Sequence, residues 1–140
     1  MDISPQRLSL ARDQANALAR DARSAWPVEA CGLLIGRRAG SVLCATRIVP
    51  TANVAGTPDR FEIDPAAHLR LQRQVRGTAD RVIGCWHSHP TGPPEPSPAD
   101  VAAAIEANFI WLIYSVAEAR LAAWWHHGGG RFSALMLDER

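Results

Sequence analysis

The first part of the chain carries apolar side chains on one face of a predicted helix. Ser4 and Pro5 are typical of a helix N-terminus, because serine caps the first turn and proline needs no amide hydrogen bond there. Small and aliphatic side chains then recur at helical spacing: Leu8, Ala11, Ala15, Leu18, Ala22 and Ala25. Pro27 disfavours a helical residue before it, so we expect the helix to run from about residue 4 to residue 26.

Apolar stretches bounded by turn residues predict the strands of a sheet in the rest of the chain. They cover residues 31–37, 41–50, 81–86, 110–116, 120–127 and 132–137. Two more helices are expected where a capping side chain is followed by proline, over residues 64–76 and 97–107. This order predicts one α+β domain over residues 1–140, with a mostly antiparallel sheet flanked by helices.

The composition is that of an ordinary globular domain. The 140 residues suffice for one hydrophobic core, and 47% of them are hydrophobic and 21% charged. The formal net charge of +1 gives no electrostatic reason to expect nucleic acid or a membrane surface as a partner. The N-terminus lacks the apolar run of a signal peptide, no segment is apolar enough to span a bilayer, and the three cysteines show no disulfide pattern. We therefore expect a cytoplasmic protein with reduced thiols.

The segment CWHSHPTGPPEPSPAD, residues 85–100, concentrates side chains that carry chemistry. His87 and His89 stand two residues apart at the end of a predicted strand, so both imidazoles point to the same side. Four prolines stiffen the return, and Asp100 in the first turn of the next helix can face the imidazoles. Two imidazole nitrogens and one carboxylate oxygen form the ligand set of a catalytic zinc ion, with the fourth position left to water.

Each part of this segment has a simpler explanation when it is taken alone. Ser97, Pro98 and Asp100 form a good helix start, with a capping serine and an acid near the positive end of the helix dipole. Two histidines at the end of a strand are commonly surface residues, and a proline cluster is commonly only a loop. The joint pattern favours a metal site over these separate readings.

The spacing H-x-H-x7-S-x2-D, formed by His87, His89, Ser97 and Asp100, resembles the JAMM motif of the MPN-domain metalloproteases. That family also has an upstream glutamate in an E-x-x-G context before an apolar strand, which Glu29 and the following residues match. The resemblance covers essentially the whole chain and implies the cytidine-deaminase-like MPN fold.

The resemblance also implies a role for each residue of the motif. His87, His89 and Asp100 would bind one zinc ion per chain, and Glu29 would be the general acid and base beside the zinc-bound water. Ser97 would donate a hydrogen bond to the oxyanion. Ser88, between the two histidines, is expected to hold the loop, because no base that would activate it as a nucleophile is evident.

The chain lacks long insertions and resembles the short prokaryotic members of the family. That resemblance implies hydrolysis of the amide or isopeptide bond after the C-terminal Gly-Gly of a ubiquitin-like or sulfur-carrier protein. Such a tail could add as a strand along residues 51–63. The oligomeric state is left open.

Other interpretations remain at this point. The motif is also similar to those of RadC-type proteins and of phage-tail-type peptidases. The near-neutral charge and the lack of a helix-hairpin-helix module argue against the first, and the second normally carries an added domain. A non-catalytic MPN scaffold is a further alternative, which the intact motif disfavours. Cys31 and Cys85 lie two residues from Glu29 and His87, where a thiolate could bind metal, but small buried side chains are the more ordinary role.

Overall fold

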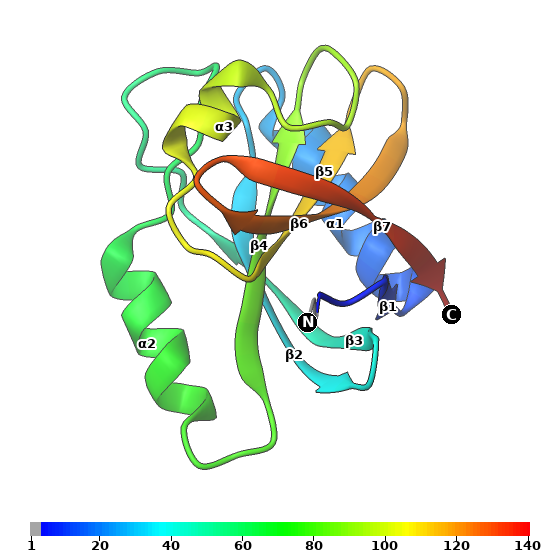
Figure 1. Cartoon of the computed structure of the whole chain (residues 1–140). Coiled ribbons are helices and arrows are strands. Elements are labelled where there is room, and N and C mark those ends of the chain that lie inside the picture. The colour runs from blue at the N-terminus through cyan, green and yellow to red at the C-terminus, as the bar shows by residue number, and fades with distance from the viewer. Residues whose placement is uncertain (1–3) are drawn as a thin grey trace.

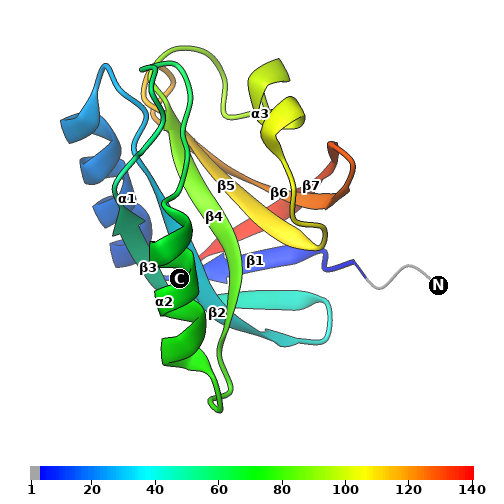
Figure 2. The same ribbon diagram turned by 90° about the vertical axis from the view of Figure 1, so that its left-hand side faces the viewer.

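The computed structural model describes residues 4–140 and shows a closed barrel with helices packed on it (Figures 1 and 2). The strands are β1 (Arg7–Leu10), β2 (Cys31–Ala39), β3 (Val42–Thr51), β4 (Arg81–His89), β5 (Phe109–Ser115), β6 (Arg120–Gly128) and β7 (Arg131–Glu139). The helices are α1 (Arg12–Ala25), α2 (Pro65–Val75) and α3 (Pro98–Ala103). Around the barrel the strand order is β1-β3-β2-β4-β5-β6-β7. The expected α+β domain with flanking helices is present.

The sheet is mixed, which corrects the expectation of a mostly antiparallel sheet. β1 pairs parallel with both β3 and β7, and β4 pairs parallel with β5. The remaining neighbours pair antiparallel. Apolar patterns identify strands but not their partners, and a parallel pair needs a crossover connection. The proline-rich loop and α3 form this crossover between β4 and β5.

The N-terminal residues form a strand where a helix was expected. Leu8 and Leu10 are 0% exposed and point into the core from β1, while α1 begins only at Arg12. The Gln14 side chain accepts a hydrogen bond from Ala11 N at 2.8 Å and so supports the helix start. The helical prediction was wrong here because Leu8 and Leu10 also fit a period of two, and β1 closes the barrel between β3 and β7.

Alternate side chains of the central strands pack in two apolar clusters. The first contains Leu34, Trp86 and Leu112 together with Leu18 of α1. The second contains Leu33, Ile35, Cys85 and Trp111 together with Leu71 and Val75 of α2. The two helices therefore pack against opposite sets of side chains, and the central strands β2, β4 and β5 are buried on both sides.

The strand that carries the histidines is longer than expected. β4 continues to His89, whereas the apolar pattern ended at residue 86. α3 is shorter than expected and ends at Ala103 instead of residue 107, because Ala104 already has an extended backbone with ψ of 121°. α2 begins as expected, with Asp64 accepting a hydrogen bond from Ala66 N at 3.0 Å. None of the described helices is long and apolar enough to cross a membrane.

Gly84 permits the close pairing of β4 with β5. A Cβ atom at this position would lie 2.4 Å from Ile110 O and 2.7 Å from Ile110 Cβ. We expect Gly84→Ala to lower the free energy of unfolding by about 1–3 kcal/mol, because the two strands would have to separate. Gly56→Ala is the matched control, since no heavy atom lies within 4 Å of its added Cβ. Urea denaturation measures both variants, and equal midpoints for Gly84→Ala and Gly56→Ala would contradict this account.

Candidate metal centre

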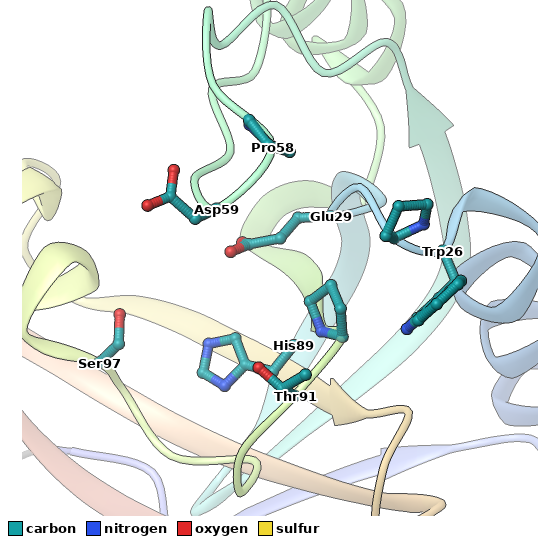
Figure 3. Close-up of a pocket in the computed structure, with 9 residues that line it drawn as sticks. Trp26, Glu29, Pro58, Asp59, His89, Thr91 and Ser97 are labelled. Atoms are coloured by element: carbon teal, nitrogen blue, oxygen red, sulfur yellow. The ribbon is translucent and has the colours of Figure 1, made fainter.

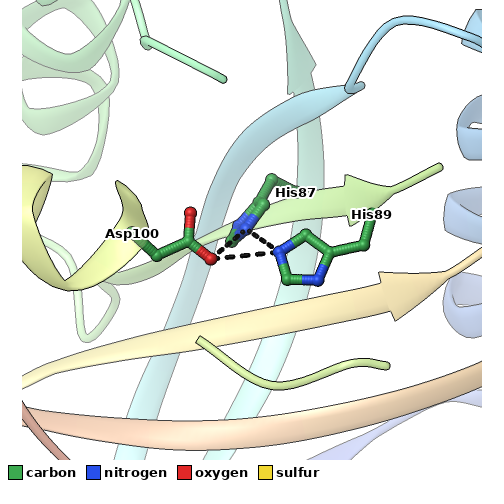
Figure 4. Close-up of side chains that lie close together, drawn as sticks. All are labelled: His87, His89 and Asp100. Atoms are coloured by element: carbon green, nitrogen blue, oxygen red, sulfur yellow. Dashed lines mark hydrogen bonds and ion pairs between the residues drawn. The ribbon is translucent and has the colours of Figure 1, made fainter. Parts of the chain in front are cut away.

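Three side chains bring one potential ligand atom each to the end of β4 (Figure 4). Nε2 of His87 lies 3.1 Å from Nε2 of His89 and 3.1 Å from Oδ2 of Asp100. Nε2 of His89 lies 3.0 Å from the same Asp100 oxygen. The sequence-predicted ligands therefore meet at one point, and all three are buried.

Local structure explains why these side chains converge. His87 and His89 project from the same face of β4 because they are two residues apart in a strand. Asp100 comes from the first turn of α3, where a capping box holds it: Ser97 Oγ accepts from Asp100 N at 3.0 Å, and Asp100 Oδ2 accepts from Ser97 N at 2.9 Å. One carboxylate therefore caps the helix and also lies where a metal ligand is expected.

The geometry of the three atoms fits a metal ion of the zinc type. Ligand bonds of about 2.0–2.1 Å in a tetrahedron place the ligand atoms about 3.3 Å apart. The separations of 3.0 and 3.1 Å lie close to this value. Imidazole and carboxylate donors suit zinc and neighbouring transition metals better than calcium or magnesium.

Each histidine is oriented by a different contact. Nδ1 of His89 donates to Pro93 O at 2.8 Å, so that in the neutral imidazole Nε2 of His89 is the unprotonated nitrogen that can act as a ligand. The ring of His87 stacks on Phe61, with centroids 4.1 Å apart, and meets Trp111 edge-on at 5.5 Å. Within residues 4–140, Nδ1 of His87 has no hydrogen-bond partner, so aromatic packing and the contact of Nε2 with Asp100 set the orientation of this ring.

The proline-rich loop between the ligands is fixed through its carbonyl groups. Gly92 O accepts a hydrogen bond from Ser115 Oγ at 2.7 Å, and Pro94 O accepts from Trp124 Nε1 at 2.9 Å. Both donors belong to strands of the barrel, β5 and β6. The loop that connects His89 to Asp100 is therefore attached to the sheet and does not depend on proline stiffness alone.

The protonation states of Asp100 and His87 suit metal binding. Burial would raise the pKa of Asp100, but hydrogen bonds with His87 and His89 outweigh burial and hold this pKa well below its usual range. Burial lowers the pKa of His87. Burial would also lower the pKa of His89, but the hydrogen bonds of His89 with Asp100 and Pro93 outweigh burial and raise this pKa. At neutral pH Asp100 is a carboxylate and His87 a neutral imidazole, the forms that bind metal.

Glu29 lies beside the candidate ligand His89 in a cavity of about 390 Å³, the site cavity (Figure 3). Trp26, Pro58 and Asp59 form parts of its wall, and His89 faces it from β4. The Glu29 side chain is 7% exposed, and its Oε1 has no hydrogen-bond partner among the described residues. Burial, assisted by the charge of Asp100, raises the pKa of Glu29 from 4.5 to about 7. A carboxyl group with this pKa can both accept and release a proton near neutral pH.

The two serines of the motif have different surroundings. Ser97 lines the site cavity with Glu29 and His89. Its hydroxyl oxygen accepts the Asp100 N–H, so the hydroxyl hydrogen remains available to donate. Ser88 is completely buried, and its Oγ accepts from Ala30 N at 2.9 Å. Ser88 therefore holds the segment that carries Glu29, in agreement with its expected structural role.

Sequence reasoning missed the aromatic support of the site. Phe61 falls in the segment considered only as an edge for an added strand, and Trp111 in a predicted strand, yet both contact His87. Asn53, which hydrogen-bonds the Glu29 carbonyl, was also missed. These residues lie far from the motif along the chain, so no spacing within the motif indicates them. Two weak sequence signals point to them: Asn53 is a polar residue in the loop after a strand, and Phe61 is an aromatic residue shortly before the Asp64 cap of α2.

Cys31 and Cys85 are not metal ligands in this arrangement. The candidate ligand group found within residues 4–140 consists of the two histidines and Asp100. Both thiols are buried and free of disulfide bonds, and burial raises the pKa of each. Cys85 packs in the apolar cluster under α2. Both cysteines therefore act as small core side chains, as their ordinary interpretation predicted.

The family of the chain follows from comparison with known proteins. Residues 11–127 match the family model described as prokaryotic homologs of the JAB domain. This match covers most of the chain, and the chain therefore belongs to the prokaryotic JAB-domain family. The resemblance drawn from the motif is confirmed.

Individual relatives agree with this assignment. A desampylase of Haloferax volcanii is 31% identical over 118 residues, which cover 81% of this chain and 84% of that protein. A CysO-cysteine peptidase of Mycobacterium tuberculosis is 28% identical over 108 residues, 77% of this chain and 73% of that protein. The solution structure of a Desulfitobacterium hafniense protein matches with a TM-score of 0.83 and 30% identity, over 95% of this chain and 92% of that one.

The raised pKa of Glu29 predicts a pH-dependent cost in the metal-free protein. Because the pKa is about 7 in the folded chain and 4.5 ordinarily, ionisation of Glu29 destabilises the folded state as the pH rises through this interval. We compare the free energies of unfolding of Glu29→Gln and the parent. The difference in favour of Glu29→Gln should be about 2–3 kcal/mol larger at pH 8 than at pH 4. Urea denaturation in the presence of a chelator measures this difference. A difference between the two proteins that does not change with pH would contradict the burial of an ionised Glu29.

Proposed function

We propose that this protein is a zinc-dependent peptidase of the JAMM type. Its substrate is the amide or isopeptide bond after the C-terminal Gly-Gly of a ubiquitin-like or sulfur-carrier protein. The observation that carries the proposal is the convergence of His87, His89 and Asp100 next to the buried carboxyl group of Glu29. The relatives named desampylase and CysO-cysteine peptidase support this substrate class over the RadC-type and phage-tail-type alternatives.

The proposed mechanism assigns a separate task to each side chain. His87, His89 and Asp100 would hold the zinc ion, which when bound lowers the pKa of a water molecule and polarises a carbonyl group. Glu29 accepts a proton from the attacking water and returns it to the leaving nitrogen; its near-neutral pKa and the free Oε1 suit both transfers. Ser97 donates its hydroxyl hydrogen to the substrate oxygen as negative charge develops there, a contact typically worth about 3 kcal/mol of the barrier.

The shape of the site suits an extended tail with small side chains. The site cavity has a volume of only about 390 Å³ and is walled by Trp26, Pro27 and Pro90. Two glycines approach such a wall more closely than larger residues. An added strand could pair along residues 51–63, which begin at the end of β3, beyond the part of β3 that pairs with β1.

The first test is cleavage of a defined conjugate. A ubiquitin-like carrier from the same genome that ends in Gly-Gly, extended by a short peptide, is incubated with the zinc-loaded protein and followed by intact-mass spectrometry. We expect cleavage directly after the second glycine. Glu29→Gln should bind the same amount of zinc but turn over at least about a hundredfold more slowly, because the proton transfer is lost.

Two outcomes would count against the proposal. Cleavage by Glu29→Gln at the parental rate would exclude the acid–base role of this residue. A zinc-loaded parent that cleaves none of the Gly-Gly carriers of its genome would favour the non-catalytic scaffold.

Metal binding gives a second, independent prediction. Zinc at a hundredfold excess over its dissociation constant should raise the free energy of unfolding by about 2.7 kcal/mol, because only the folded chain brings the three ligands together. His87→Ala should lose this gain, whereas His68→Ala, which changes a histidine of α2 outside the ligand group, should keep it. Thermal denaturation with and without zinc measures both. An equal gain in His87→Ala would place the metal elsewhere.

A further inference from the structure

The side-chain amide of Asn53, two residues after β3, uses its full hydrogen-bonding capacity. Nδ2 donates to Glu29 O at 2.9 Å and to Arg60 O at 3.0 Å. Oδ1 accepts from Ala55 N and from Glu62 N, both at 3.0 Å. Because two partners are carbonyl groups and two are N–H groups, the partners themselves determine the orientation of the amide.

The loop that Asn53 organises, residues 54–62, forms one side of the candidate site. Pro58 and Asp59 line the site cavity (Figure 3), and Phe61 stacks on the metal ligand His87. A bridge between Asn53 and Ile63 closes the base of the loop. Asn53 therefore connects this loop to the main chain of Glu29.

A second contact holds the Glu29 segment from the side of β4. Ser88 Oγ accepts from Ala30 N at 2.9 Å, and Ser88 N donates to Ala30 O at 3.0 Å. The carboxyl group of Glu29 itself has an oxygen without a hydrogen-bond partner in residues 4–140. The position of this carboxyl group in the site cavity therefore depends on how its main chain is held.

We propose that Asn53 is a positioning residue that fixes Glu29 against the loop over residues 54–62. By holding the Glu29 carbonyl and the Arg60 carbonyl with one amide group, it sets the distance between the Glu29 backbone and the cavity wall. The effect on turnover rests on the proposed function, whereas the hydrogen bond and its effect on the Glu29 backbone do not.

The alternative is that Asn53 only stabilises the turn that follows it. The contact from Ala55 N to Asn53 Oδ1 is the usual hydrogen bond of an asparagine turn and would be sufficient for that role. Asn53→Asp separates the two roles. An aspartate keeps an oxygen to accept from Ala55 N and Glu62 N, but it has no N–H for the Glu29 and Arg60 carbonyls, and its second oxygen would repel them.

The experiment compares the parent with Asn53→Asp, Asn53→Ala and Thr57→Ala. Thr57→Ala is the matched control, because it removes only the contact of Arg60 Nε with Thr57 Oγ1 in the same loop. The carbonyl ¹³C resonance of Glu29 reports its hydrogen bond, the amide exchange of Ala55 and Glu62 reports the turn, and kcat and KM are measured on the Gly-Gly conjugate. Zinc content is determined for each protein.

We expect Asn53→Asp to shift the Glu29 carbonyl resonance upfield while the Ala55 and Glu62 amides stay protected. Its kcat should fall about tenfold to a hundredfold with KM within about twofold and zinc content unchanged, because a small displacement of a catalytic group has effects of this size. Asn53→Ala should lose the protection of both amides as well. Thr57→Ala should keep kcat within about twofold.

Either of two results would overturn the inference. An unshifted Glu29 resonance in Asn53→Asp would show that the amide does not hold this carbonyl. A shifted resonance with parental kcat would show that the contact does not position the carboxyl group for turnover. If the parent cleaves no conjugate, the proposed function fails, and the resonance alone decides whether Asn53 holds Glu29.

Discussion

A single carboxylate oxygen, Oδ2 of Asp100, joins the elements on which the site depends. It accepts the Ser97 N–H at the start of α3 and lies within 3.1 Å of the His87 and His89 nitrogens at the end of β4. Burial of a charged group is costly unless the group is paired and hydrogen-bonded. The start of the helix, the end of the strand and the ligand group therefore form one arrangement. A displacement of α3 from β4 would separate the carboxylate from both histidines and leave it only the contacts within its own helix cap.

The alternation of β4 divides its last residues between two tasks. His87 and His89 project toward Asp100, whereas Ser88 projects to the other side and holds the main chain at Ala30. One strand thereby positions the two candidate ligands and, through the hydrogen bonds of Ser88 with Ala30, the segment that carries Glu29. This division requires that β4 remain extended through its last residue, and its parallel pairing with β5 through His89 and Ser115 maintains that conformation.

The sequence predicted most elements of the fold but not their pairing. Strong apolar runs and capping residues located the strands and α2, because these signals are local. The segment at Leu8 and Leu10 was assigned to a helix, since its spacing fits both periods and the barrel closure that decides between them is a long-range contact. The parallel pairing of β4 and β5 was missed for the same reason.

For the site, the sequence by itself predicted the candidate ligand group that the structure brings together. His87, His89 and Asp100 lie within one short segment, where a strand, a stiff loop and a helix cap leave few geometries, and the distant Glu29 followed from the family motif. Only the tertiary structure decided what orients these groups: Phe61 against His87 and Asn53 on the Glu29 carbonyl. Such contacts join segments far apart in the chain, and packing in three dimensions, which no local pattern encodes, selects them.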